Sequence, residues 1–186
     1  MRRMRLLAWA AVALAAAACS SSGRYTPPPE PPPLAIERLD RPIAFAVDPG
    51  LDATAFSYEC GLGGEATYDY GDALGQQVRA VFEQRYSQAI EVAPELADVV
   101  VAYRGATLEF RGEQGVLTYH VSYRLFLHLA IIAADGETSD FTVTGRSQDD
   151  VFRSFFDVCG SGAEMIERLT PELLKNLAKS LAVRLN

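Results

Sequence analysis

The longest regular pattern in the chain is an alternation of apolar and polar residues over positions 117–133. Every odd position from Leu117 to Ile131 is apolar, which is the period-two pattern of a β-strand with one buried face. The even positions change from mostly polar to apolar along the run: Thr118, His120, Ser122, Arg124, Phe126, His128, Ala130 and Ile132. At about 3.3 Å per residue the strand would be about 55 Å long. We expect it to organise a sheet with one covered face and one face that is wet for at least half its length.

Shorter patterns predict three further strands. Ile43–Val47 alternates as a short strand, and residues 98–111 contain an apolar VVVAY run typical of a central strand. The GEQG sequence at 112–115 predicts a hairpin turn into the long strand. Asp135-Gly136 predicts a second hairpin, which leads to a strand at 139–146. The last three strands should therefore form an antiparallel meander.

Two segments have the period of amphipathic helices. Asp72 is a suitable cap for a helix over residues 73–88. A second helix is expected over residues 161–185, with a kink or a restart at Pro171. Each segment has a single apolar stripe, so both helices can pack on the same face of a sheet.

Residues 51–71 have no clean period and contain several turn residues, so we interpret them as a long loop around Cys60, with a short strand at 66–70 as an option. The order of elements is then β-α-β-β-β-α in one domain over residues 43–186. It predicts an α+β two-layer sandwich, with a mostly antiparallel four-stranded sheet and two helices on one face. The other face of the sheet is left for solvent, lipid or a partner.

Residues 1–18 have the pattern of an export signal: arginines, an apolar run, and small residues that end at Cys19. Residues 14–19 resemble the lipobox of bacterial lipoproteins. The resemblance implies that Cys19 becomes an acylated amino terminus, held in the membrane by more than one acyl chain. Ser20 replaces the aspartate that retains lipoproteins in the inner membrane, which implies the periplasmic face of the outer membrane. An ordinary cleaved signal with an incidental Cys19 is the alternative.

Residues 19–42 are predicted to be a linker after the lipidated cysteine, because six of the seven residues from 27 to 33 are proline. Such a run favours polyproline II at about 3.1 Å per residue, and the linker could hold the domain up to roughly 70 Å from the anchor. A proline-rich ligand for an aromatic groove is the alternative. Without the leader the chain has 14 basic and 24 acidic residues, a net charge of −10. This sign argues against nucleic acid as a partner.

Cys60 and Cys159 are the cysteines outside the lipobox, and each is followed by glycine. Behind an export signal the compartment is oxidising, so the pair is interpreted as a disulfide. Closing a loop of about 100 residues would stabilise the fold by up to about 4.7 kcal/mol in the chain-entropy model. Two buried free thiols remain the alternative.

The sequence contains little that suggests catalysis. His120 and His128 are the only histidines, and at about 3.3 Å per residue they lie about 26 Å apart on one strand, too far to share a metal or a base. Gly61–Gly64 lacks the spacing of a dinucleotide or phosphate loop. A loose acidic group lacks EF-hand spacing: Glu59, Glu65, Asp69 and Asp72. We therefore expect no catalytic residue, no metal site and no cofactor.

Two groups of residues remain as binding candidates. The first is the even face of the long strand, with His120, Arg124, Phe126 and His128, and with Arg104 and Arg111 nearby on the preceding strand. Arginine beside an aromatic ring suits a phosphorylated glycolipid or an acidic partner, although an ordinary solvated face is the plainer interpretation. The second is the aromatic group Phe152, Phe155 and Phe156, which docks a partner or covers an open end of the core.

The order of elements behind a lipidated cysteine resembles that of small outer-membrane lipoproteins of the LptE and YajG type. The string VFRSFFD at 151–157 resembles the segment before the last helix in LptE. The resemblance implies a non-catalytic accessory subunit of an envelope export machine, most concretely lipopolysaccharide transport, with an outer-membrane barrel as partner and a glycolipid as ligand. An auxiliary lipoprotein of an ABC-type lipid or polysaccharide transporter, bridging the periplasm, is the main alternative. A hydrolase that uses His120 or His128 is a third.

Overall fold

The computed structural model describes residues 22–26, 33, 36–60, 64–114, 119–151 and 158–185. Within these ranges, no helix has both the length and the apolar character needed to cross a membrane. The elements form two sheets and two main helices around one hydrophobic core.

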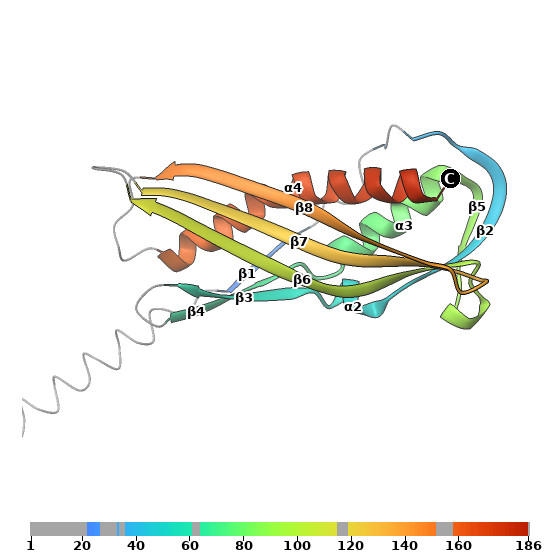
Figure 1. Cartoon of the computed structure of the whole chain (residues 1–186), viewed down its shortest axis with the longest axis horizontal. Coiled ribbons are helices and arrows are strands. Elements are labelled where there is room, and N and C mark those ends of the chain that lie inside the picture. The colour runs from blue at the N-terminus through green and yellow to red at the C-terminus, as the bar shows by residue number, and fades with distance from the viewer. Residues whose placement is uncertain are drawn as a thin grey trace, which may run out of the picture.

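The larger sheet has five strands in the order β5-β2-β6-β7-β8 (Figure 1). The strands are β2 (Leu39–Val47), β5 (Tyr86–Glu91), β6 (Val99–Gln114), β7 (Tyr119–Ala133) and β8 (Thr138–Val151). β2 runs parallel to both of its neighbours, whereas β6, β7 and β8 form an antiparallel meander. The predicted meander and its long central strand are therefore confirmed.

The first hairpin turn lies beyond the predicted GEQG position. Gly112, Glu113 and Gln114 are still paired with β7, and Gln114 lies opposite Tyr119. The second hairpin forms where it was expected, with Gly136 at a φ of 86°, a left-handed conformation that glycine adopts without a steric penalty.

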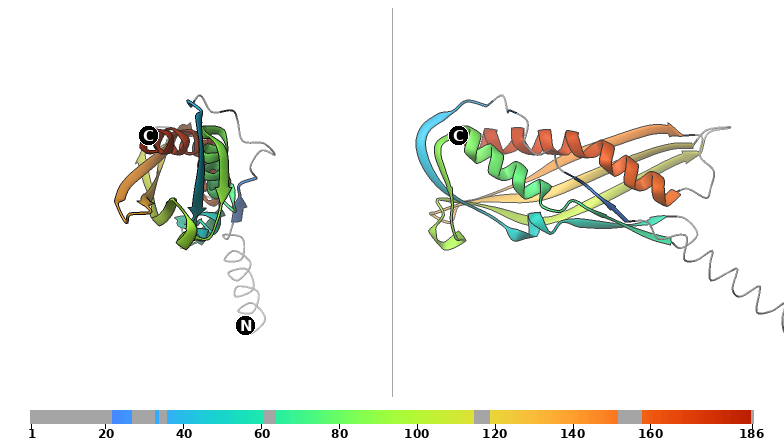
Figure 2. Two further views of the ribbon diagram at one scale, coloured as in Figure 1. Left: turned by 90° about the vertical axis from the view of Figure 1, so that its right-hand side faces the viewer. Right: turned by 180° about the vertical axis from the view of Figure 1, so that it is seen from behind.

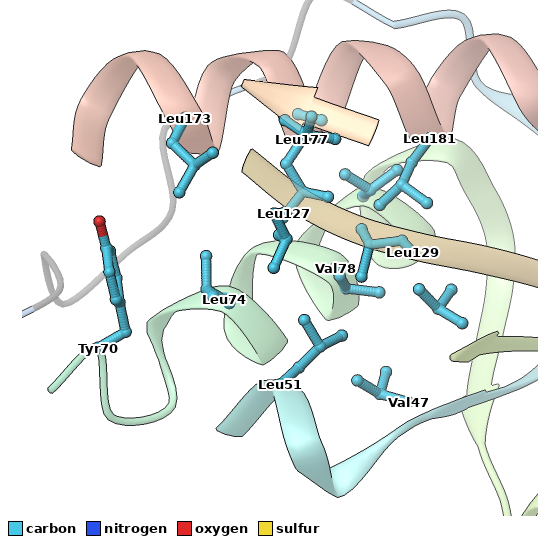
Figure 3. Close-up of a cluster of buried hydrophobic side chains, with 14 of the residues drawn as sticks. Val47, Leu51, Tyr70, Leu74, Val78, Leu127, Leu129, Leu173, Leu177 and Leu181 are labelled. Atoms are coloured by element: carbon cyan, nitrogen blue, oxygen red, sulfur yellow. The ribbon is translucent and has the colours of Figure 1, made fainter. Parts of the chain in front are cut away.

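The helices α3 (Ala73–Arg85) and α4 (Val158–Arg184) lie side by side against one face of the large sheet (Figure 2). We call this the inner face. Leu125, Leu127 and Leu129 of β7 project from this face toward the helices and are at most 1% exposed. They meet apolar side chains at helical spacing on both helices, including Leu74, Val78, Leu173, Leu177 and Leu181 (Figure 3).

A second, three-stranded sheet has the order β1-β4-β3. It consists of β1 (Ser22–Arg24), β3 (Ala55–Cys60) and β4 (Gly64–Asp69), and the short helix α2 (Pro49–Asp52) precedes β3. The rings of Tyr58 and Tyr123 meet edge to face, with centroids 6.4 Å apart, so the small sheet also packs toward the inner face.

The α+β class is confirmed, but the predicted single sheet of four strands is wrong because three segments were misassigned. The first is the β3–β4 hairpin, which lies inside the predicted loop at 51–71. The sequence signal for this hairpin was an alternation of apolar and polar residues. In the structure, Phe56 and Tyr68 are buried, while Ser57 and Thr67 are exposed. The turn-rich composition around this alternation hid it.

The second misassigned segment is the end of the predicted helix at 73–88. The helix stops at Arg85, and Tyr86 adopts extended angles (φ −109°, ψ 146°). The Tyr86 hydroxyl donates to the carbonyl of Leu185, 3.1 Å away and close to the end of α4. Residues from Tyr86 to Glu91 then pair in parallel with β2. Sheet pairing and this buried contact outweigh the weak helical preference of the segment.

The third is Ser22–Arg24, which belongs to the predicted linker yet forms β1, paired in parallel with β4. The linker interpretation therefore does not describe the whole of residues 19–42. A 3-10 turn, η1 (Pro94–Leu96), precedes β6.

Of the two outcomes expected at Pro171, a kink or a restart, the restart does not occur, because α4 continues through this proline as one helix. Proline lacks the N–H that would bond to the carbonyl four residues earlier, which favours a bend. The helix axis changes direction in its middle (Figures 1 and 2). The hydroxyl of Thr170 donates to the carbonyl of Ile166 at 2.8 Å beside the proline.

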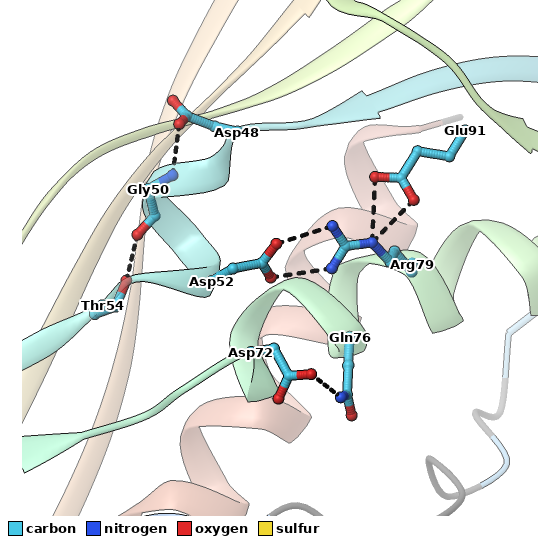
Figure 4. A network of polar contacts seen from close by, with 8 residues as sticks. All are labelled: Asp48, Gly50, Asp52, Thr54, Asp72, Gln76, Arg79 and Glu91. Atoms are coloured by element: carbon cyan, nitrogen blue, oxygen red, sulfur yellow. Dashed lines mark hydrogen bonds and ion pairs between the residues drawn. The ribbon is translucent and has the colours of Figure 1, made fainter.

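A polar network joins α2, α3 and β5 (Figure 4). The Arg79 guanidinium forms two 3.0 Å hydrogen bonds to the Asp52 carboxylate and two to the Glu91 carboxylate, of 2.9 and 3.2 Å. These bonds to Asp52, followed by those to Glu91, raise the pKa of Arg79. Gly75 leaves room for this arrangement, since a Cβ there would collide with the Asp52 carboxylate. The network therefore joins α2, α3 and β5 locally.

Candidate functional site

The face of the large sheet opposite the helices is here called the outer face. It consists of alternate side chains of β6, β7 and β8: Thr107, Glu109, Arg111, Ser122, Arg124, Phe126, His128, Thr142, Thr144, Arg146 and Gln148. Arg124 lies on the middle strand of the meander and is nevertheless exposed. Its exposure shows that no other element of the described chain covers the middle of this face.

Three arginines gather on adjacent strands of the outer face. Arg124 lies directly between Glu109 of β6 and Arg146 of β8. Arg111 lies opposite Ser122, one pair further along the same face. Directly opposite residues have Cβ atoms about 5 Å apart, and diagonal neighbours about 7–8 Å apart. The three guanidinium groups therefore share one patch, and among the outer-face side chains that the structure describes next to them, the carboxylate is that of Glu109.

The arginines of this patch are weakly engaged within the chain. The Nε atom of Arg146 lies 3.7 Å from a carboxylate oxygen of Glu172 on α4, and both side chains are exposed. An exposed pair of this kind contributes little, roughly 0–1 kcal/mol. Among the residues that the structure describes, no ion pair involves Arg111 or Arg124. Their planar forks are available for carboxylate or phosphate oxygens.

Phe126 adds apolar surface next to the arginines. It is half-buried and lies between Thr107 and Thr144, which are in register with it on the two neighbouring strands. In the next row, Nδ1 of His128 lies 3.0 Å from the hydroxyl of Thr142. The patch thus combines cationic forks, an aromatic ring and hydroxyl groups.

An ion pair limits the patch at the end of the molecule near the second hairpin. Arg104 Nε lies 3.7 Å from Asp140 Oδ1, although their strands are separated by β7. Ala130, which is in register with Asp140, is fully buried. The Arg104 side chain therefore reaches across β7 to pair with Asp140 on β8. Arg111 has no such partner among the described residues and belongs to the patch with Arg124 and Arg146.

The structure places Arg124, Phe126 and His128 together on the outer face, as the alternation in the sequence predicts. The backbone of His120 lies in β7 between Glu113 and Asp150, and its side chain is outside the described residues. Eight positions separate the two histidines on one strand, so the structure does not bring them together. The binding role of all four residues remains a prediction.

Arg146 and Glu109 were missed as members of this group. Arg146 sits at the end of the predicted strand at 139–146, in phase with two threonines. The period-two signal could have assigned it to the outer face, but only the strand register shows that it lies beside Arg124.

The other sequence candidates have a different outcome. Phe152, Phe155 and Phe156 lie outside the described residues. Cys60 ends β3 and Cys159 lies in the first turn of α4. A Cβ at Gly162 would collide with the ring of Tyr58, so the two segments approach closely near both cysteines. The disulfide stays a prediction, which non-reducing gels with thiol labelling would test.

Buried tyrosines lie between the small sheet and α4. Tyr70 is fully buried, and its hydroxyl is 3.2 Å from that of Thr170. Desolvation raises the pKa of both Tyr68 and Tyr70, and for Tyr70 this effect exceeds the opposing hydrogen bond to Thr170. Both hydroxyls therefore remain protonated at neutral pH. Across the described ranges, no group of three or more His, Cys, Asp or Glu residues could hold a metal ion.

No family model matches this chain. No characterised relative matches it either. Among solved structures, the chain is similar to a minor lipoprotein from Acinetobacter baumannii, with 12% identity, coverage of 79% of this chain and 91% of that chain, and a TM-score of 0.45. It is also similar to the rare lipoprotein B from Shewanella oneidensis, with 13% identity, coverage of 77% and 96%, and a TM-score of 0.46.

A third similar structure is an uncharacterized lipoprotein B from Nitrosomonas europaea, with 13% identity, coverage of 78% of this chain and 82% of that chain, and a TM-score of 0.41. At these values the likeness to small bacterial lipoproteins concerns the general arrangement of helices and strands.

Proposed function

We propose that this protein is a non-catalytic lipoprotein, anchored through Cys19 at the periplasmic face of the outer membrane, that binds an anionic partner through its outer face. The observation that carries the proposal is the exposed group of Arg111, Arg124 and Arg146 around Phe126. A sheet face with no covering layer needs no arginine for folding. Guanidinium groups on adjacent strands are suited to phosphate or carboxylate oxygens.

The net charge of the chain strengthens this interpretation. Without its leader the protein has a charge of −10, so most of its surface repels anions. A local group of three arginines within such a chain gives an anionic ligand one favourable place to bind. The aromatic ring beside the arginines would contact the apolar part of an amphiphile.

The most concrete version of this function is an accessory subunit of a machine that exports lipopolysaccharide to the outer membrane. The phosphorylated head group would bind the arginines, and an outer-membrane barrel would be the protein partner. An auxiliary role in an ABC-type transporter that bridges the periplasm remains the alternative, and the two differ in partner.

Photocrosslinking in cells tests the proposal with the full-length protein. A benzophenone amino acid replaces Phe126 on the outer face, and a matched control carries it at Lys179, an exposed position on α4. We expect the Phe126 variant to crosslink an outer-membrane barrel or lipopolysaccharide, and the Lys179 variant to give neither product. A crosslink to an inner-membrane transporter would favour the alternative. Equal crosslinking from both positions would refute the outer face as the binding surface.

The anchor has its own test. Metabolic labelling with a clickable fatty acid should label the wild-type protein, and Cys19→Ser should abolish the label. Labelled protein should fractionate with the outer membrane. An unlabelled mature terminus would refute the anchor without affecting the outer-face test.

A further inference from the structure

The strand that follows the predicted anchor is part of the folded domain. Ser22, Gly23 and Arg24 are in register with Thr67, Tyr68 and Asp69 of β4. The backbone N–H of Tyr25 donates to the carbonyl of Asp69 at 2.9 Å, and Arg24 Nε lies 3.6 Å from its carboxylate. The ring of Tyr25 lies 6.3 Å from that of Tyr70. Backbone, charge and aromatic contacts thus hold β1 on the small sheet.

Gly23 shows how closely β1 is packed. A Cβ at this position would lie 2.7 Å from the ring of Tyr68 and 3.1 Å from the methyl group of Ala163 on α4. Real Cβ atoms essentially never come as close as the first distance, so the strand fits only because this residue has no side chain. β1 therefore sits on both β4 and α4, and any larger residue at Gly23 would displace it.

This packing places the domain close to the anchor. Only two residues, Ser20 and Ser21, separate Cys19 from the first residue of β1. A fully extended chain spans at most about 3.6 Å per residue, so the Cα atoms of Cys19 and Ser22 are at most about 11 Å apart. The proline run begins after β1, at Pro27, and so lies outside this tether. It connects β1 to β2 within the domain.

The direction of β1 determines which end of the molecule faces the anchor. β1 is parallel to β4, and Ser22 lies beside Thr67, toward the end where β4 begins at Gly64. β6 and β8 end and α4 begins at the same end of the molecule (Figure 1). The turn between β7 and β8 lies at the opposite end.

We infer that β1 is a clamp that holds the domain directly on the lipid surface, with the Gly64 end of the small sheet toward the membrane and the β7–β8 turn away from it. This inference rests on the proposed acylation of Cys19. The proline run is then an internal connection and does not act as a spacer. The distance between the outer face and the bilayer is consequently short and fixed.

A pair of insertions tests the clamp. Ten glycine and serine residues are inserted after Ser20 in one variant and after Pro31 in the other. The acylated proteins are reconstituted in vesicles of phosphatidylethanolamine and phosphatidylglycerol that contain an acceptor-labelled lipid. A donor dye is attached through a clickable amino acid at Thr67 or, in separate samples, at Asp135 near the far turn. Energy transfer reports the distance of each position from the bilayer.

With the clamp, transfer from Thr67 should exceed transfer from Asp135 in the uninserted protein. The insertion after Ser20 should lower the Thr67 signal, because ten flexible residues add about 18 Å to the tether. The insertion after Pro31 should leave the signal unchanged, because it lies on the domain side of β1. A loss of transfer from the Pro31 insertion equal to that from the Ser20 insertion would overturn the inference, and so would no loss from either.

Substitutions within β1 give a second readout. Gly23→Val should release the strand, lower the transfer from Thr67, and make residues 22–26 sensitive to protease. Ser22→Val is the matched control, since it adds a valine to the same strand at an exposed position. Unchanged protection in Gly23→Val would argue against the clamp. If no variant associates with vesicles, the proposed anchor itself fails, which the fatty-acid label would show independently.

Discussion

The two faces of β7 differ in burial: its inner-face side chains are buried in the core, and the residues that alternate with them lie on an uncovered face. Leu125, Leu127 and Leu129 are at most 1% exposed, and they join the helices into one core. Arg124 and Phe126 alternate with these leucines in sequence, yet they face a surface that no described element covers. Burial of the inner face accounts for the stability of the fold. The outer-face side chains are not needed for this core. This contrast is the reason to look for binding on the outer face.

The largest expected effect is the loss of a core leucine. Leu127→Ala should lower the free energy of unfolding by about 2–5 kcal/mol, because it leaves a cavity at a fully buried site. Phe126→Ala is the matched control on the next residue and should cost clearly less, since its ring is half-buried. Urea denaturation of the two variants gives both values. Similar costs would show that the outer face also contributes to folding.

An added methyl group on the inner face should have the next largest effect. A Cβ at Gly145 of β8 would lie 2.8 Å from the Cβ of Leu173 and 3.1 Å from the carbonyl oxygen of Leu169. Gly145→Ala should therefore push α4 away from the sheet and cost about 1–3 kcal/mol. Arg146→Ala, on the adjacent outer-face position, should cost less than about 1 kcal/mol. Thermal unfolding of both variants would check this order.

The buried tyrosines predict a loss of stability at alkaline pH. Burial raises the pKa of Tyr70 above its ordinary value of 10.0, so the unfolded chain loses this proton before the folded one does. The stabilisation is complete below pH 10 and falls as the pH rises further, by at most about 1.4 kcal/mol per pH unit for each such tyrosine. Urea midpoints between pH 8 and 11 should show this decline, and Tyr70→Phe should reduce its slope. A flat profile for the wild type would contradict the assignment.

The smallest effect on stability is expected on the outer face, where the effect on binding should be greatest. Arg111→Glu with Arg124→Glu should leave the free energy of unfolding within about 0.5 kcal/mol per substitution, because both side chains are exposed. The same variant should lose the crosslink formed from Phe126 in cells. Lys175→Glu with Lys179→Glu makes the same change of charge on α4 and should keep it. Retention of the crosslink in the arginine variant would show that the arginines do not recognise the partner.

Secondary structure and side-chain exposure could be predicted best where the pattern of neighbouring residues alone determines them. The alternation around Leu125 and Leu127 fixed the strand, its faces and the exposure of Arg124, because side chains of a strand alternate strictly. Two helices with single apolar stripes were equally clear. The position of Arg146 beside Arg124 could not be predicted, because strand register depends on the turn that joins the strands.

Other elements depended on contacts between distant segments. The sequence around Tyr86 fits the period of the preceding helix. In the structure the helix ends before Tyr86, because Tyr86 pairs with β2 and its hydroxyl donates to the carbonyl of Leu185. Ser22–Arg24 has no strand pattern at all, and its three residues form β1 only because β4 and α4 offer a surface that fits Gly23. Weak local preferences of this kind are overridden by tertiary packing.

By itself, the sequence determined a lipobox-like leader, an acidic chain, and a long two-sided strand followed by a hairpin, since these follow from composition and from the period of neighbouring residues. Only the tertiary structure decided that Ser22–Arg24 joins the domain, that a second sheet exists, and that three arginines share one exposed patch. Those features arise from pairing and packing between residues far apart in the chain, whose free energies no local pattern contains.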